Sequence, residues 1–293
     1  MSGPGTGEPG AGAQRDAVIA SPANPRLRDA AALRERRERD RRGRILVDGA
    51  REIARALDGG LTIEEAFVPA GLLGSGAPGE ARDIADTLRL AGVSIVGLEP
   101  AAMRRLAFGD REGEPVAVAI PPGAELGSLA LPAGALVVVL EGVEKPGNLG
   151  AIMRCADGAG ADAVIVAGGP IDPWNPNVIR ASLGTVFTMQ LAVAPVEAVL
   201  AWLRAAGLGL FAARVDGARA YTDANLAGPA AIVLGSEARG LSEAWRGPDV
   251  TAISLPMLGR ADSLNVAATA AVLLYEARRQ RDERDRSVVA PRP

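Results

Sequence analysis

The chain has 293 residues, of which 48% are hydrophobic and 23% charged, with a formal net charge of −3 and no histidine. This composition indicates a globular chain with two domains or one large one, and the missing histidines exclude a Ser-His-Asp triad and most zinc sites. No apolar run approaches the roughly 18–20 residues of a membrane span, and the N-terminus does not look like a signal peptide. Because Cys155 is the only cysteine, we expect no internal disulfide and a cytoplasmic location.

The first part of the chain predicts a tail and then a small α/β domain. Residues 1–15 are rich in glycine and proline, which is typical of a disordered segment. Residues 16–120 predict a basic helix, a short strand and a second helix, followed by strands at "EEAFVPAG", "VSIVGLE" and "VAVAI" with a helix between the first two. Residues 121–134 contain several prolines and glycines and predict a linker.

The basic helix carries an uneven charge. Its sequence "RLRDAAALRERRERDRRGR", residues 26–44, has nine arginines and four acidic residues, a local net charge of 9 − 4 = +5. One interpretation is a helix that binds RNA or phosphate. The other is a solvated helix held by Glu/Arg pairs, and the segment alone leaves both open.

From residue 135 the pattern changes to strands that alternate with helices. "ALVVVLEGV" is typical of a strand buried on both faces, and five further strands are expected at "AVIVAG", "FTMQLAV", "LGLFAA", "AAIVLG" and "TAISLP". This alternation predicts a parallel, doubly wound sheet over residues 135–283, with a short tail at 284–293. "GAGADA" fits a dinucleotide fingerprint, but it ends a predicted helix instead of opening one, so its glycines are interpreted as a helix C-cap.

Three loops of this second part share one character. "EGVEKPGNLG", "GSEARG" and "LPMLGRADSLN" each contain glycine together with Asn, Ser or Glu directly after an apolar strand. Ligands of parallel sheets bind at the carboxyl ends of strands, so the three loops predict one shared pocket.

The segments that contain these loops resemble a known family. "NLGAIMRCADGAGA", "LGSEARGL" and "ISLPMLGRADSLNVAATAAVLLYE" look like the three ordered motifs of the SpoU/TrmH RNA ribose 2′-O-methyltransferases of the trefoil-knotted SPOUT class, over residues 136–281. The N-terminal unit is similar to the L30e-like RNA-binding domain that often accompanies them. The resemblance implies S-adenosyl-L-methionine as cofactor, a homodimer without metal or membrane, and a substrate in 23S ribosomal RNA, in some relatives with antibiotic resistance as the outcome.

The resemblance also implies roles for individual residues. The backbones of Gly235, Leu255 and Leu264 would contact the cofactor, and Met257 would add an apolar wall. The residues implied in catalysis are Arg154, Asn148, Glu237, Ser263 and Asn265. Arg154 matches the essential arginine; because a guanidinium rarely gives up its proton, we expect it to stabilise the developing oxyanion of the ribose, not to act as a base.

The other catalytic residues would support Arg154 and the pocket. Asn148 is expected to orient the reacting groups and to cap its helix, and Glu237 to hold the guanidinium of Arg154. Each also has a purely structural interpretation: Asn148 as a simple cap, Ser263 as the cap of the final helix, and the charged side chains as solvated. The expected RNA contacts are Arg26, Arg34, Arg37, Arg41, Lys145 and Arg180.

Three functions follow in order of preference. The first is RNA ribose methyl transfer, and the second is a catalytically silent RNA-binding member of the same fold. The third, a nucleotide enzyme that does not act on RNA, lacks a P-loop because Lys145 precedes the glycine and does not open the helix.

Overall fold

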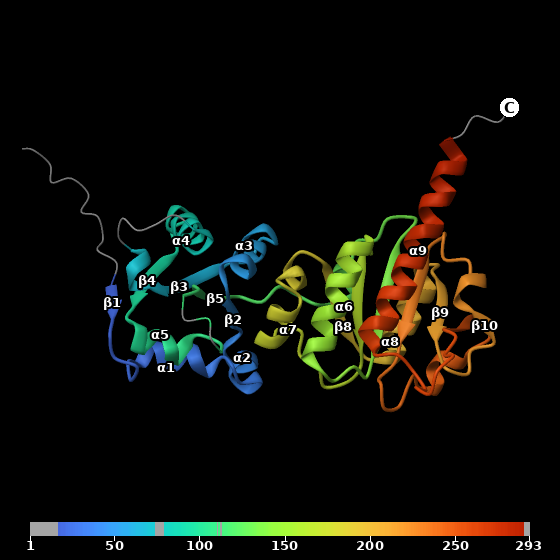
Figure 1. Cartoon of the computed structure of the whole chain (residues 1–293), viewed down its shortest axis with the longest axis horizontal. Coiled ribbons are helices and arrows are strands. Elements are labelled where there is room, and N and C mark those ends of the chain that lie inside the picture. The colour runs from blue at the N-terminus through green and yellow to red at the C-terminus, as the bar shows by residue number, and fades with distance from the viewer. Residues whose placement is uncertain (1–16, 74–78, 110, 112, 290–293) are drawn as a thin grey trace, which may run out of the picture.

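The computed structural model describes residues 17–73, 79–109, 111 and 113–289. They form two α/β domains that lie end to end, with strands β1 to β5 in the N-terminal domain and β6 to β12 in the C-terminal domain (Figure 1). The expected N-terminal tail lies outside the described residues. Where a C-terminal tail was expected from residue 284, the last helix instead continues to Val289.

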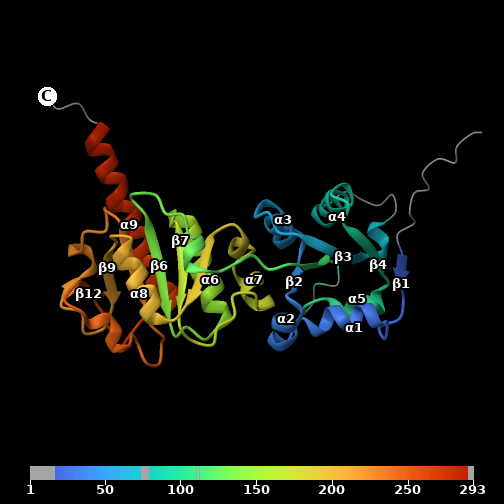
Figure 2. The same ribbon diagram turned by 180° about the vertical axis from the view of Figure 1, so that it is seen from behind.

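The N-terminal domain is a mixed sheet between two layers of helices. Its order is β1 (Ala17–Ile19), β4 (Ser94–Leu98), β3 (Ile63–Pro69), β5 (Val116–Ala119) and β2 (Ile45–Asp48), and β5 runs antiparallel to both of its neighbours. Helices α3 (Ala50–Asp58) and α4 (Glu80–Leu90) cover one face, and α1 (Pro25–Ala32), α2 (Arg36–Arg42) and α5 (Pro100–Leu106) lie on the other (Figure 2).

The expected single basic helix is in fact two helices. Asn24 caps α1 by accepting a hydrogen bond from the backbone N–H of Arg26. Helix α1 buries Leu27 and Ala30 on one face and ends at Ala32. Glu35 is extended, at φ −84° and ψ 129°, so α2 starts in a new direction. The short edge strand β1 and helix α5 were not expected from the sequence.

The C-terminal domain is a seven-stranded sheet in which every pair is parallel, as predicted. Its order is β10 (Arg219–Ala220), β12 (Val250–Ser254), β9 (Gly209–Ala213), β11 (Ala230–Leu234), β6 (Leu136–Glu141), β7 (Ala163–Ala167) and β8 (Gln190–Ala194). The central strands β6, β7 and β11 consist almost wholly of buried Ala, Val, Ile and Leu, which explains their continuous apolar sequence.

Helices cover both faces of this sheet. Helices α6 (Pro146–Ala159), α7 (Pro176–Ala181) and α9 (Val266–Val289) pack on one face, and α8 (Val196–Ala205) packs on the other. Gly160 ends α6 in the left-handed conformation (φ 70°), so the "GAGADA" segment is a helix end, as interpreted. Short 3₁₀ helices are η1 (Ala70–Leu72), η2 (Leu126–Ser128), η3 (Thr185–Phe187), η4 (Tyr221–Asp223) and η5 (Glu243–Arg246).

The two domains share one hydrophobic core. Side chains of β2 and α3 in the N-terminal domain belong to the same buried cluster as Val178, Ile179 and Phe187 of the C-terminal domain. The connecting segment 121–134 follows the edge of the second sheet, where the N–H of Val193 donates to the carbonyl of Ala124 at 2.8 Å. Within the described ranges, no helix is both long and apolar enough to cross a bilayer.

Candidate functional site

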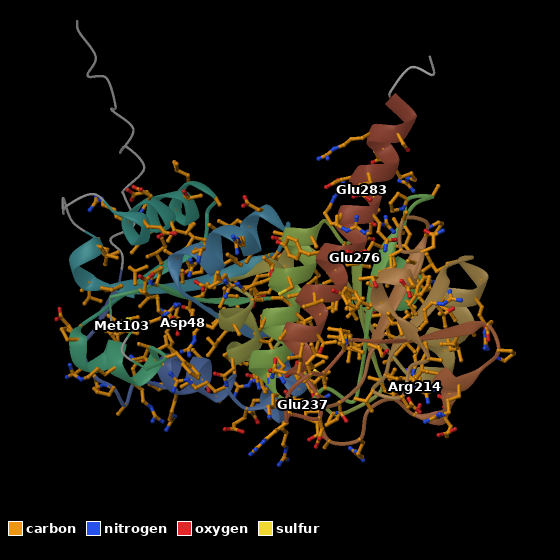
Figure 3. The ribbon with its side chains drawn as sticks, turned by 45° about the vertical axis from the view of Figure 1, so that its right-hand side comes forward. Asp48, Met103, Arg214, Glu237, Glu276 and Glu283 are labelled. Atoms are coloured by element: carbon orange, nitrogen blue, oxygen red, sulfur yellow. The ribbon has the colours of Figure 1, made fainter. Side chains whose placement is uncertain are left out.

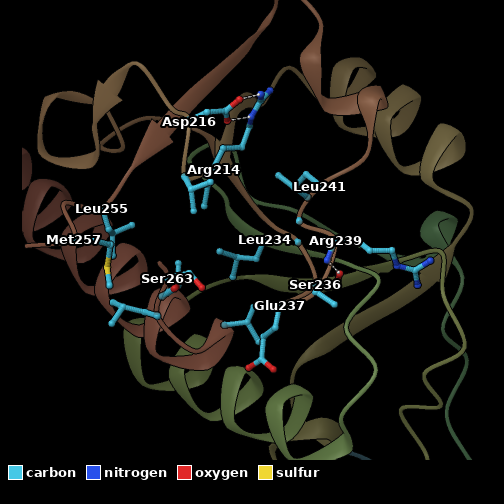
Figure 4. Close-up of a pocket in the computed structure, with 18 of the residues that line it drawn as sticks. Arg214, Asp216, Leu234, Ser236, Glu237, Arg239, Leu241, Leu255, Met257 and Ser263 are labelled. Atoms are coloured by element: carbon cyan, nitrogen blue, oxygen red, sulfur yellow. Dashed lines mark hydrogen bonds and ion pairs between the residues drawn. The ribbon is translucent and has the colours of Figure 1, made fainter. Parts of the chain in front are cut away.

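A cavity of about 490 Å³ opens at the carboxyl ends of β9, β11 and β12 (Figure 4). Six of the residues expected in the pocket line it: Gly235, Glu237, Leu255, Met257, Ser263 and Leu264. Two of the three expected loops therefore meet here, and the third reaches the same place through hydrogen bonds to Glu237. Figure 3 shows Glu237 and Arg214 at the same end of the C-terminal domain, with Glu276 along α9.

Gly235 is needed because two parts of its own loop approach closely. A Cβ on Gly235 would lie 2.3 Å from the carbonyl carbon of Gly240 and 2.6 Å from the nitrogen of Leu241. The loop is closed there by the N–H of Gly240, which donates to the carbonyl of Ser236 at 2.9 Å. We expected glycine for a close approach to a ligand; the structure shows that the loop backbone itself demands it.

Glu237 joins the three loops into one network. Its carboxylate accepts hydrogen bonds from Nζ of Lys145 at 2.7 Å, Nδ2 of Asn148 at 3.2 Å and Nδ2 of Asn265 at 2.5 Å. The same Nδ2 of Asn265 lies 3.3 Å from Oδ1 of Asn148. The Lys145 ammonium, followed by Asn148, holds the pKa of Glu237 below its usual value, and the carboxylate in turn raises the pKa of Lys145.

Two capping expectations are corrected. Helix α6 begins at Pro146 with Lys145 as its N-cap residue, so Asn148 lies inside the first turn and its side chain is free to meet Glu237. At the start of α9, Oδ1 of Asn265 accepts the N–H of Ala267 at 2.9 Å, which is the bond that a cap makes. Asn265 therefore supplies the cap that the structural interpretation gave to Ser263, and Ser263 lines the cavity.

Arg154 lies away from this network. It is exposed on α6, does not line the cavity and makes no hydrogen bond or ion pair within the described part of the chain. Arg154 follows Asn148 by six positions in α6, which corresponds to about 9 Å along the axis and about 240° around it. The expected contact between Glu237 and the guanidinium of Arg154 is therefore wrong, because Glu237 is already held by Lys145, Asn148 and Asn265.

A charged group that was not expected from the sequence lies at the other end of the cavity. Arg214 donates to both carboxylate oxygens of Asp216, Nε to Oδ1 at 2.8 Å and Nη2 to Oδ2 at 2.6 Å, and Arg246 lies 3.5 Å from the same Oδ2 (Figure 4). Hydrogen bonding to Arg214 lowers the pKa of Asp216 to about 2. The sequence contains a pattern that could have indicated this group, because "ARVDG" places charged residues directly after a strand, as the three recognised loops do.

The expected RNA-binding arginines have different surroundings. Arg34 donates from Nη2 to the carbonyls of Leu106 and Ala107, both at 2.7 Å, so it supports its own domain. Arg180 stacks over the ring of Phe108, 4.2 Å from its centroid, and joins the two domains. Both residues therefore have structural contacts within the chain, and their expected contact with RNA stays a prediction.

The remaining arginines of this set lie at the surface. Arg26 pairs with Glu65 and Arg41 with Glu38. Arg37 is exposed and has no hydrogen-bond or ion-pair partner among the residues that the structure describes. These three remain available to an RNA.

Both domains match known families. Residues 135–275 match the model of the SpoU rRNA Methylase family, and residues 24–113 match the MRM3-like substrate binding domain. A 23S rRNA (uridine(2479)-2'-O)-methyltransferase of Streptomyces viridochromogenes is 33% identical over 260 residues, which are 86% of this chain and 88% of the relative.

Solved structures agree over nearly the whole chain. The crystal structure of an RNA 2'-O ribose methyltransferase matches with a TM-score of 0.79 and 42% identity, over 90% of this chain and 99% of that one. The SpoU methyltransferase AviRb from Streptomyces viridochromogenes, solved in complex with the cofactor AdoMet, matches with a TM-score of 0.79 and 32% identity, over 88% and 98% of the two chains.

Proposed function

Because the chain belongs to the SpoU rRNA methylase family, we propose that it transfers a methyl group from S-adenosyl-L-methionine to a ribose 2′-hydroxyl of 23S ribosomal RNA. The observation that carries this proposal is the network around Glu237, which gathers three strand-ending loops at the mouth of one cavity. Such a substrate places the reaction in the cytoplasm.

The cavity suits the proposed cofactor. Its volume of about 490 Å³ lies in the range of small-molecule sites. Leu234, Leu255 and Met257 give it apolar walls, and the loops after β11 and β12 add backbone donors and acceptors for a flat, polar base. When bound, S-adenosyl-L-methionine supplies an electrophilic methyl group on a sulfonium, so the chain itself must orient the acceptor and stabilise its charge.

The network supplies the orienting groups. Glu237 fixes the amide groups of Asn148 and Asn265, so these side chains cannot rotate freely at the cavity mouth. Lys145 uses one of its three N–H groups on Glu237, and its side chain is 72% exposed, which leaves donors for an RNA phosphate. A fixed carboxylate, two amides and a cation would align a ribose and bind the phosphate backbone of the RNA.

The position of Arg154, exposed and outside the cavity of its own chain, suits a role in the site of a second copy of the chain. Arg154 and Gly158 share one face of α6, one helical turn apart, and a Cβ on Gly158 would lie 3.0 Å from the hydroxyl of Tyr275 on α9. Tyr275 and Val272 are 54% and 36% exposed on this side, and Leu264 is 41% exposed at the cavity. We place the interface of a homodimer on this α6–α9 face, where Arg154 would reach the partner's acceptor site.

Methyl transfer is tested with labelled cofactor and bare ribosomal RNA. The purified protein should label a ribose of 23S ribosomal RNA, and mapping the blocked 2′-oxygen would name the nucleotide. Label found only on bases would contradict the proposed chemistry. Tight RNA binding without calorimetric binding of S-adenosyl-L-methionine would support the catalytically silent alternative instead.

The dimer is tested by complementation. An Arg154→Ala chain and a Glu237→Ala chain should each be inactive as homodimers. If Arg154 serves the partner's site, a mixed dimer restores one intact site and regains activity. A mixture that stays inactive, or a monomer by light scattering at micromolar concentration, would refute this arrangement.

A further inference from the structure

The two domains meet around one buried ion pair. Arg39 lies inside the basic segment 26–44, and its side chain is only 4% exposed. Its partner Asp172, in the loop after β7, is 10% exposed. Nε of Arg39 donates to Oδ2 of Asp172 at 3.0 Å, and Nη2 donates to the same oxygen. The sequence left open whether this segment binds RNA or is solvated, and both interpretations expose its arginines, so the burial of Arg39 needs a physical explanation.

Every group of this pair is satisfied. Nη1 of Arg39 donates to the carbonyls of Leu33 at 2.8 Å and Arg34 at 2.6 Å, and Oδ1 of Asp172 accepts the N–H of Trp174 at 2.8 Å. Burying two charges costs desolvation energy, which full hydrogen bonding offsets only when the geometry is fixed. The pair therefore defines one orientation of α2 against the C-terminal domain.

The contacted loop belongs to the edge of the sheet that carries the cavity. It follows β7 at the carboxyl end, and β7 lies next to β6, which is followed by Lys145 and by Asn148 in the first turn of α6. The loops after β7 and β6 touch, since a Cβ on Gly169 would lie 3.5 Å from Cα of Gly142. Nη1 of Arg36 also donates to the carbonyl of Pro170 in the same loop.

The other side of α2 faces solvent. Arg37 and Arg41 lie two residues before and after Arg39, about 200° around the helix, and both are exposed. Figures 1 and 2 both show α2 beside α7 at the junction of the domains. The outward arginines are thereby held at a fixed distance from Lys145 and from Asn148 at the start of α6.

We propose that the Arg39–Asp172 pair is an interdomain latch and that Arg39 is a positioning residue for RNA. This inference rests on the proposed function. The latch holds the outward face of α2 and the mouth of the cavity as one RNA-binding surface, so a long RNA is bound at two places at once. Two linked sites bind more tightly than either alone only while their spacing suits the same ligand.

The test compares two RNAs with two latch variants. Arg39→Met removes the charge, and the double variant Arg39→Met/Asp172→Leu replaces both partners with apolar side chains, which preserves packing if the single variant folds poorly. For both variants we expect the KM for 23S ribosomal RNA to rise by about tenfold or more. Their kcat, their affinity for S-adenosyl-L-methionine and their KM for a short hairpin around the mapped nucleotide should stay within about twofold.

A matched control removes an ion pair inside one domain. Arg204 and Asp249 pair at 2.7 Å on the surface of the C-terminal domain, so Arg204→Met should leave both KM values unchanged. An equal loss on the long and the short RNA would overturn the latch, because it would indicate damage to the cavity itself. An unchanged KM for the long RNA in both variants would overturn it as well.

Amide hydrogen exchange gives a readout that does not depend on activity. Without RNA, residues 168–182 should exchange at least about tenfold faster in the latch variants, while the loops after β11 and β12 keep their protection. Unchanged exchange over residues 168–182 would refute the latch. Failure of the wild-type protein to methylate any RNA would refute the proposed function, and the latch would then be decided by this exchange and by filter binding of 23S ribosomal RNA.

Discussion

Asn265 holds Glu237 in place across the mouth of the cavity. Its Nδ2 donates to Oε1 of Glu237 at 2.5 Å while its Oδ1 accepts the N–H of Ala267, so one side chain starts α9 and orients the carboxylate. The last helix and the loop after β11 are therefore fixed relative to each other. A change at either residue should disturb the geometry of the reaction before it disturbs the fold.

We expect Glu237→Gln to lower kcat/KM for RNA by about 100-fold, because the amide loses its attraction for Lys145 and half of its acceptors. The melting temperature should barely change, since the network is exposed. Steady-state methyl transfer and a thermal melt measure the two effects. Glu283→Gln, which changes an exposed carboxylate on α9, is the matched control and should keep full activity.

Arg154→Ala should reduce methyl transfer by about 10²–10³-fold, the range for loss of one group that stabilises a developing oxyanion. Because Arg154 does not line the cavity of its own chain, calorimetric affinity for S-adenosyl-L-methionine should stay nearly intact. Arg154→Lys should recover part of the rate by keeping the charge. A large loss of cofactor binding in Arg154→Ala would mean that Arg154 has been placed wrongly.

Gly235→Ala should weaken cofactor binding by tenfold or more, because its Cβ would stand 2.3–2.6 Å from the backbone of Gly240 and Leu241 and would open the loop. Gly228→Ala is the control, since nothing lies within 4 Å of its added Cβ. Calorimetry on both variants measures the difference. Equal affinities would show that the loop tolerates the methyl group.

Asp48 predicts a pH dependence of stability. Burial raises the pKa of Asp48 to about 6, although the positive charge of the nearby Arg111 acts to lower it. The folded state therefore binds a proton at Asp48 more tightly than the unfolded state does. Ionised Asp48 destabilises the folded state, and this cost is absent below about pH 4 and complete above about pH 6. The unfolding free energy therefore falls as the pH rises through this window. Asp48→Asn should stabilise the protein by roughly 1–3 kcal/mol at pH 7 and by little at pH 4.

Denaturant unfolding at both pH values measures this effect. Asp58→Asn, at the exposed end of α3, is the control and should show no such difference. An Asp48→Asn protein that is less stable than wild type at pH 7 would show that ionised Asp48 is held favourably by the arginines around it.

Arg281 anchors the last helix, α9, to the central strands of the C-terminal sheet. Its guanidinium donates to the carbonyls of Gly134, Ala135, Leu226 and Gly228, at the amino ends of β6 and β11. Arg281→Met should lower the unfolding free energy by roughly 2–4 kcal/mol, because carbonyls that lie close to the core lose a charged donor. Chemical unfolding measures the loss, and Arg284→Met, nearer the helix end, should cost less.

Much of the fold could be predicted from the sequence, since its local signals are strong. The apolar runs of β6, β7 and β11, the glycine that ends α6 and the alternation of strands with helices gave a parallel sheet with its loops at one edge. The position of the cavity followed from that edge, and six of the residues expected in the pocket line it. Local periodicity determines these features because each depends on neighbours along the chain.

Other features depended on contacts between distant parts of the chain. Nothing in the composition of the basic stretch distinguishes the buried Arg39 from the exposed Arg37, because the difference arises from Asp172 more than 130 residues later. Likewise, Glu237 was assigned to Arg154 and is in fact held by Lys145, Asn148 and Asn265. The sequence determined which residues could carry the chemistry, and the tertiary structure decided which of them meet, because a charged side chain takes whichever opposite charge the packed backbone brings within hydrogen-bonding distance.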